Sequence, residues 1–412
     1  MQSKSATLRR RATSNAARTP ISSKHETSSI DRDAAGVTSI NRRRGHRHAI
    51  GGLWWQVAVI SVLFAMPVAG QDAVTQIQAE IDRLQQFLKA GVVQPPGFPD
   101  VNSMVGDPLK AAAASLRAGR LYMSLEYLDQ ATDLLHGVQT VADKAEAVKS
   151  GLPAFESEWG KTSLELTALE PKVREKNWEE VRAAIRALAE AAQGKAIPLL
   201  DGGRGFATAI QPRDGLFYVG QAQGEAAFAR FCAALNLPRN TAPLALRSML
   251  PELTRLQEKT NAAFQPPRSV ELHPRFIALN STLKLAEELD AARFYAGAFY
   301  QYLEAVRHYG LLDAPPLNAA QQAELTQAIA AMRKKLEASR RDDSIAQLFL
   351  ERAESQLAHA DGSAPSQDEW RSAKVIVDQV LPAYFAALTA PSPVERPSGK
   401  RIEITLVRWP YT

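Results

Sequence analysis

The sequence has 412 residues, 45% of them hydrophobic and 23% charged, and a formal net charge of +5 at pH 7. This positive charge comes from residues 1–48, which hold 11 Lys and Arg against 3 Asp and Glu, whereas residues 71–412 (the body) hold 38 against 41. The body therefore lacks the positive field that attracts nucleic acid or an anionic membrane, and its one cysteine, Cys232, cannot form an internal disulfide bond.

Residues 1–48 form a basic leader. They are rich in Ser, Thr and Arg and poor in apolar residues, which predicts a disordered segment. The leader is longer than the basic region of an ordinary signal peptide. Two explanations stay open: translation that starts near Val37, or an organellar transit peptide in residues 1–20.

Residues 49–70 have the pattern of an export signal. The uncharged run 53–69 follows the arginine-rich stretch 42–47, and the small residues 68–70 favour a cleavage site. We predict a signal peptide and a body exported to the periplasm or another extracytoplasmic compartment. The alternative is a signal anchor kept in the inner membrane through residues 50–69, although a span requires about 20 apolar residues. Membrane contact is expected only through 49–70, if that segment stays uncleaved.

The body has the composition and periodicity of an all-α protein. Apolar residues recur at helical spacing, for example at Ile77, Ile81, Leu84 and Leu88, while Pro and Gly fall between such segments. Residues 80–86 resemble 252–258, residues 94–96 resemble 265–267, and residues 118–127 resemble 291–300, at offsets of 172, 171 and 173. A weaker pair, 177–178 with 369–370, has an offset of 192. We predict a helical duplication with copies at 72–197 and 251–391 and an intervening helical segment at 198–250.

Short pieces of the body resemble tetratricopeptide-like helical hairpins. The residues that carry the resemblance lie within 105–137, 174–192 and 366–384, and they are Gly119, Leu121, Ser124, Leu128 and Ala131, then Trp178, Val181, Ile185 and Leu188, then Trp370, Ala373, Val377 and Val380. The resemblance implies hairpins that stack into a short, irregular α-solenoid or form two helical bundles.

Residues 392–412 form a Pro-linked tail whose end predicts a β-strand. Apolar residues alternate with polar ones at Ile402, Ile404 and Leu406, and Trp409 and Tyr411 follow. A lone strand on a helical protein has backbone groups that need partners. These five residues are therefore predicted to dock onto a partner protein by adding a strand to its sheet.

The sequence contains no motif that specifies catalysis. The four histidines of the body lack metal-ligand spacing, so no metal site is predicted. The glycine-rich stretch 201–205 lacks the Gly-Lys-Ser/Thr of a phosphate-binding loop, so no cofactor is predicted. The acidic residues are interpreted as solvated helix faces. We expect a protein that is not an enzyme.

Aromatic side chains suggest a binding surface. Tyr and Phe residues are concentrated near 294–309 and recur at 122 and 127, with an arginine close to each group. The candidate residues are Arg120, Tyr122, Tyr127, Arg293, Tyr295, Phe299 and Tyr302. They would either fill the core of the hairpins or line a groove that grips a peptide or glycan.

Two functional hypotheses follow. The first is an exported, non-enzymatic helical-repeat protein that binds another envelope protein through its C-terminal tail. The alternative is a periplasmic protein that binds a small ligand, a peptide or a glycan in a pocket between the two copies.

Overall fold

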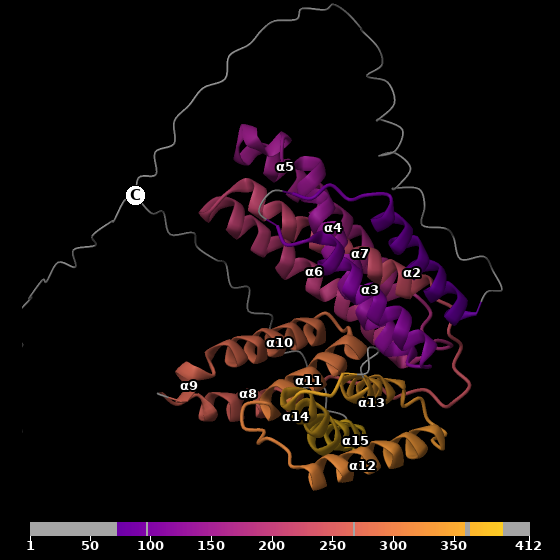
Figure 1. Cartoon of the computed structure of the whole chain (residues 1–412). Helices are drawn as coiled ribbons and strands as arrows, with labels where there is room; N and C mark the ends of the chain where they lie inside the picture. The colour runs from indigo at the N-terminus through magenta and orange to yellow at the C-terminus, as the bar shows by residue number, and fades with distance from the viewer. Residues whose placement is uncertain (1–71, 96–97, 267, 359–362, 390–412) are drawn as a thin grey trace, which may run out of the picture. The chain divides into compact units, whose positions relative to one another are not determined.

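The computed structural model describes residues 72–95, 98–266, 268–358 and 363–389 (Figure 1). Regular secondary structure in these ranges is helical, which confirms the predicted all-α class, and β-pairing there is limited to the bridges Val181–Pro238 and Ala242–Arg341. No helix in these ranges is both long and apolar enough to cross a membrane. The leader, the export signal and the C-terminal strand lie outside the described residues, so what was predicted for them stays a prediction.

The helices of the N-terminal half are mostly long. They are α2 (Ala73–Lys89), α3 (Val101–Arg117), α4 (Leu121–Lys144), the 3-10 turn η1 (Ala147–Ser150), α5 (Leu152–Glu175), α6 (Ala183–Ala209) and α7 (Pro212–Ala234). Helix α7 packs along both α4 and α6. The predicted boundary after residue 197 lies inside α6. Helix α7 lies in the predicted intervening segment, but its packing makes it part of the core of this half.

The C-terminal half follows a connection over 235–249. Its helices are α8 (Leu250–Ala263), α9 (Arg268–Glu271), α10 (His273–Ala291), α11 (Tyr295–Gly310), α12 (Ala319–Glu337), α13 (Ser344–Leu357), α14 (Gln367–Val375), the π-helical turn η2 (Ile376–Val380) and α15 (Leu381–Thr389). Helices α11 and α13 of this half pack against α6, and α13 also packs against α4.

Helix α2 illustrates how the local sequence specifies these elements. The carboxylate of Asp72 accepts a hydrogen bond from the Thr75 N–H at 2.7 Å and so caps the first turn. Three of the periodic residues, Ile77, Ile81 and Leu84, are at most 1% exposed. The predicted apolar stripe is therefore the buried face of the helix.

Two helical hairpins, α3–α4 and α10–α11, have the same turn. In each turn one residue adopts the left-handed conformation, Gly119 with φ of 73° and Arg293 with φ of 63°. Glycine adopts this conformation without steric cost, whereas for arginine it costs about 1–2 kcal/mol. The common geometry relates the two hairpins by an offset of 174 residues.

The backbone hydrogen bonds follow the same register. The Arg120 N–H donates to the Ser115 carbonyl at 2.9 Å, and the Phe294 N–H donates to the Leu289 carbonyl at 2.9 Å. Arg120 thus corresponds to Phe294, and not to Arg293 as the sequence similarity at an offset of 173 suggested. The two arginines do not occupy matching positions.

Candidate functional site between the helical halves

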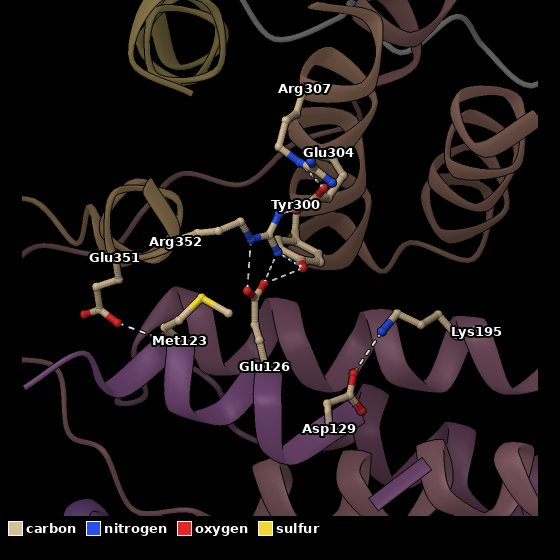
Figure 2. A network of polar contacts seen from close by, with 9 residues as sticks. All are labelled: Met123, Glu126, Asp129, Lys195, Tyr300, Glu304, Arg307, Glu351 and Arg352. Carbon is tan, nitrogen blue, oxygen red and sulfur yellow. Dashed lines mark hydrogen bonds and ion pairs between the residues drawn. The ribbon is translucent and has the colours of Figure 1, made fainter. Parts of the chain in front are cut away.

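A cavity of about 410 Å³ lies where α4, α6, α7, α11 and α13 meet. Both halves contribute to its lining, which combines charged, amide, aromatic and aliphatic side chains: Met123, Glu126, Tyr127, Asp129, Gln130, Asp133, Leu188, Lys195, Glu225, Tyr300, Arg352 and Gln356. We call Arg352, Glu126, Tyr300, Glu304 and Arg307 the Arg352 network. We call Lys195, Asp129, Asp133 and Glu225 the Lys195 cluster. Figure 2 shows the whole network and the Lys195–Asp129 pair.

The Arg352 network joins the two halves through one guanidinium group. Arg352, on α13, binds the carboxylates of Glu126 on α4 and Glu304 on α11, and its Nε lies 3.1 Å from Glu126 Oε2. The Tyr300 hydroxyl donates to Glu126 Oε1 at 2.7 Å, and Arg307 Nε donates to Glu304 Oε2 at 2.9 Å (Figure 2). Two cations and two anions thus balance one another.

Electrostatic interactions keep Glu304, Arg352 and Tyr300 in their usual charge states. Burial would raise the pKa of Glu304, but Arg307 and Arg352 outweigh burial and lower this pKa to about 2. Burial also opposes the charge of Arg352, but Glu126 and Glu304 raise its pKa well above the usual value. Burial and the charge of Glu126 raise the pKa of Tyr300, so its hydroxyl remains a donor.

The Lys195 cluster is unbalanced. Lys195 Nζ, on α6, lies 2.9 Å from Asp129 Oδ2 and 3.5 Å from Glu225 Oε1. Asp133, one turn beyond Asp129 on α4, accepts a bond from Gln221 Nε2 at 3.3 Å. Three carboxyl groups therefore share a single ammonium group.

The protonation of the cluster reflects this imbalance. Burial and the charge of Asp129 raise the pKa of Asp133 to about 8, and burial and Asp129 also raise that of Glu225 well above its usual value. Burial would lower the pKa of Lys195, but the charges of Asp129 and Glu225 raise it well above the usual value. Lys195 therefore stays charged, whereas the protonated forms of Asp133 and Glu225 are favoured.

One oxygen of each acid in the cluster is buried and accepts no hydrogen bond from the described residues: Asp129 Oδ1, Asp133 Oδ1 and Glu225 Oε2. Glu225 is only 3% exposed and Asp129 only 8%. A buried acceptor without a donor costs about 1–3 kcal/mol. The cluster therefore retains acceptor capacity that a bound molecule with N–H groups would satisfy.

Glycines in α7 bring Glu225 to this position. A Cβ atom on Gly224 would lie 2.6 Å from the Cα atom of Asp133, and one on Gly220 would collide with the backbone of α4 at His136. Only residues without side chains permit this close approach of the two helices. The small residues of α7 thus place a carboxylate beside the acids of α4.

The predicted aromatic surface is distributed over several environments. Only Tyr127 of the seven candidates lines the cavity, and its hydroxyl lies 3.3 Å from Ser355 Oγ. Tyr122 and Phe299 are each 2% exposed, so these two side chains lie in the core. Tyr295, Tyr302 and Arg120 are half-buried, and Arg293 is exposed. The tail residues Ile402, Ile404, Leu406, Trp409 and Tyr411 lie outside the described residues.

The charged residues of the cavity were not singled out from the sequence. They were interpreted as parts of solvated helix faces, yet Glu225 is buried, as is Glu351, which lies outside the lining. A signal is present in retrospect, because Glu225 follows a stretch with Gly220, Ala222 and Gly224, and Glu351 directly follows the apolar residues 348–350. An acid in an apolar stretch is rarely buried without a partner.

Within the described ranges, no group of three or more His, Cys, Asp or Glu side chains could hold a metal ion. Comparison of the chain with protein-family models, curated proteins and solved structures found no match. The functional inference therefore depends on the cavity itself.

Proposed function

We propose that the body is an exported, non-enzymatic protein that binds a small polar ligand in the cavity between its helical halves. The observation that carries this proposal is the cavity lining, to which four helices from both halves contribute charged groups and α11 contributes Tyr300. Its volume of about 410 Å³ lies in the range of small-ligand sites. Binding of an envelope protein through residues 393–412 stays a separate prediction, because those residues lie outside the described ranges.

We further propose that the two halves arose by duplication, and reciprocal helix capping supports this. Glu351, on α13, accepts hydrogen bonds from the Tyr122 and Met123 N–H groups at the start of α4, at 2.8 and 3.0 Å. Glu190, on α6, accepts a bond from the Gly297 N–H at the start of α11, at 2.8 Å. A carboxylate from each half therefore caps the second helix of the other half's hairpin.

This reciprocity favours two packed bundles over a short solenoid. In a solenoid each repeat contacts only its neighbours along the array. Here α13 reaches back to α4, and α6 reaches forward to α11. The cavity lies among these four helices and α7, so the duplication would itself have created the binding site.

A thermal-shift screen of the full chain tests the binding function. The panel should contain amines, carboxylates, sugars, peptides and muropeptides, because the proposal requires a saturable rise in melting temperature with at least one class. The non-enzymatic part requires that the ligand be recovered unchanged after incubation. If no compound raises the melting temperature, the proposal is wrong.

A blocked cavity provides the matched control. Gln130 is exposed at the cavity, and Gln130→Trp should obstruct it and abolish the ligand-induced shift. Gln86 is also an exposed helical glutamine, on α2 and outside the cavity lining, so Gln86→Trp should leave the shift unchanged. A shift that survives Gln130→Trp would place the ligand elsewhere.

A further inference from the structure

We infer that the ligand carries a primary ammonium group on an aliphatic chain, and that this group binds among Asp129, Asp133 and Glu225. The inference rests on the proposed binding function and adds the chemical class of the ligand. It depends on three observations: the kind of unsatisfied atoms in the cavity, the charge of the lining, and the apolar side chains beside the acids.

Every buried lining atom that lacks a hydrogen-bond partner among the described residues is an acceptor. These atoms are Asp129 Oδ1, Asp133 Oδ1, Glu225 Oε2 and Gln356 Oε1. Gln356 is an amide on α13, so the pattern extends beyond the three acids and across both halves. When the three acids are ionised, these four oxygens all accept hydrogen bonds, and an ammonium group supplies three N–H donors and no acceptor.

The charge of the lining also favours a cation. Four carboxyl groups line the cavity (Glu126, Asp129, Asp133 and Glu225), against two cations, Lys195 and Arg352. Arg352 is shared with Glu304, which lies outside the lining, so it leaves little positive charge for the cavity. The pKa values of Asp133 and Glu225 are raised, and a bound cation would favour the ionised forms of these two acids, whereas an anion would not.

Lys195 shows how an ammonium group is held here. Its Nζ already lies between Asp129 and Glu225, at 2.9 and 3.5 Å. Each of these acids has a second oxygen that the lysine does not use. A second ammonium group would bond to those oxygens and to Asp133, and it would neutralise the remaining charge.

The aliphatic part of the ligand has a place as well. Met123 and Leu188 contribute apolar surface to the lining, and Tyr127 adds an aromatic ring. Methylene groups packed on such side chains are worth about 0.8 kcal/mol each when they are fully buried. A diamine and the side chain of a lysine residue share this chemistry.

Calorimetric titration of the full chain with matched ligands tests the inference. 1,5-Diaminopentane should bind, whereas 1,5-pentanediol and glutarate, of the same length but neutral and anionic, should not. Blocked lysine (Nα-acetyl-lysine amide) distinguishes the two sources of the ammonium group. If it binds, the natural ligand is the side chain of a lysine residue in a peptide. If the diamine binds and blocked lysine does not, the natural ligand is a free amine. Asp133→Asn should weaken diamine binding by roughly tenfold, the effect of losing one charge-assisted bond.

The control is Asp107→Asn, which removes an exposed acid of α3 that pairs with Lys110 away from the cavity and should leave the affinity unchanged. Glu225→Gln is a second test, and circular dichroism establishes that both cavity variants fold.

Diamine binding that survives Asp133→Asn and Glu225→Gln would overturn the ammonium site. Cavity-dependent binding of glutarate or pentanediol, without the diamine, would overturn the ligand class and leave the proposed function standing. Failure of every ligand, with no shift in the wider screen, would overturn both.

Discussion

The Tyr300 hydroxyl donates a 2.7 Å hydrogen bond to Glu126 Oε1, and these two residues occupy the same position in their helices. Glu126 lies six residues after the N-cap residue Arg120 of α4, and Tyr300 lies six residues after the N-cap residue Phe294 of α11. An acid at one position and a phenol at the other form a donor–acceptor pair, whereas two acids would repel each other. Arg352 in turn binds both oxygens of the Glu126 carboxylate.

Removal of Arg352 should strongly destabilise the protein. Glu126 and Glu304 have side chains only 10% and 9% exposed, and Arg352→Ala would leave both carboxylates buried without this partner. Breaking a buried ion pair in this way costs about 3–5 kcal/mol. We expect a corresponding loss in the free energy of unfolding, measured by urea denaturation.

An exposed ion pair is the control for that measurement. Lys110 pairs with Asp107 on α3, where the side chains are 77% and 65% exposed, so Lys110→Ala should cost at most about 1 kcal/mol. Equal losses in the two variants would show that the Arg352 network does not hold the halves together.

The helices were predictable because their signals are local. Apolar spacing at Ile77, Ile81 and Leu84 defines the buried face of α2 without reference to any other segment. The register between the two hairpins was not predictable from the sequence. Sequence similarity paired Arg120 with Arg293, whereas the turn geometry pairs Gly119 with Arg293. The left-handed residue of the second turn is an arginine, so the glycine that usually marks such a turn is missing.

The charged cavity was hidden from the sequence for a different reason. Whether Asp129 or Glu225 is solvated depends on how closely α4 and α7 approach, and the two acids are 96 residues apart. Likewise, Arg352 meets Glu126 only because α13 packs on α4. Burial of a charge is a property of the packed structure, and helical periodicity carries no information about it.

The close approach of α4 and α7 makes Gly224 a sensitive position. A Cβ atom there would lie 2.6 Å from the Cα atom of Asp133, so Gly224→Ala forces the helices apart. We expect a loss of about 1–3 kcal/mol in unfolding free energy, typical of overpacking. Displacement of Glu225 should weaken amine binding in the same variant.

Gly202 lies in an open environment and provides the control, because its substitution by alanine changes helix propensity without changing the packing of helices. A Cβ atom on Gly202, inside α6, would have no neighbour within 4 Å. Gly202→Ala should therefore stabilise the protein by about 0.5–1 kcal/mol, because alanine is the better helix former. If Gly224→Ala is equally stabilising, the approach of α7 to α4 is looser than the structure indicates.

The raised pKa of Asp133 predicts a pH-dependent effect of its substitution. Burial and Asp129 raise this pKa from 3.8 to about 8, so the folded state binds more protons than the unfolded state between these values. The stability that Asp133 contributes when protonated is present below about pH 4 and is lost as the pH rises to 8. Asp133→Asn cannot ionise, so its melting temperature relative to the parent should increase over this window.

The comparison of variant with parent is needed because other groups titrate nearby. Burial lowers the pKa of His136 and His308 to about 4 each, which makes the stability of both proteins rise between pH 4 and 6.5. These contributions cancel in the difference between variant and parent. Asp107→Asn, which removes an exposed acid outside the cavity lining, is the control variant. A flat difference for Asp133→Asn would contradict the raised pKa.

Amine binding should release protons near pH 7. With a pKa of about 8, Asp133 is largely protonated at that pH, and a bound ammonium group would favour its ionised form. Calorimetric titrations of 1,5-diaminopentane in buffers of different ionisation enthalpy should therefore show proton release, to which Asp133 would contribute up to about one proton for each ligand bound. The dependence on buffer should decrease in Asp133→Asn, because that side chain has no proton to lose and only Glu225, whose pKa is also raised, remains to release one. Diamine binding without proton release in the parent would show that the ammonium group does not approach Asp133.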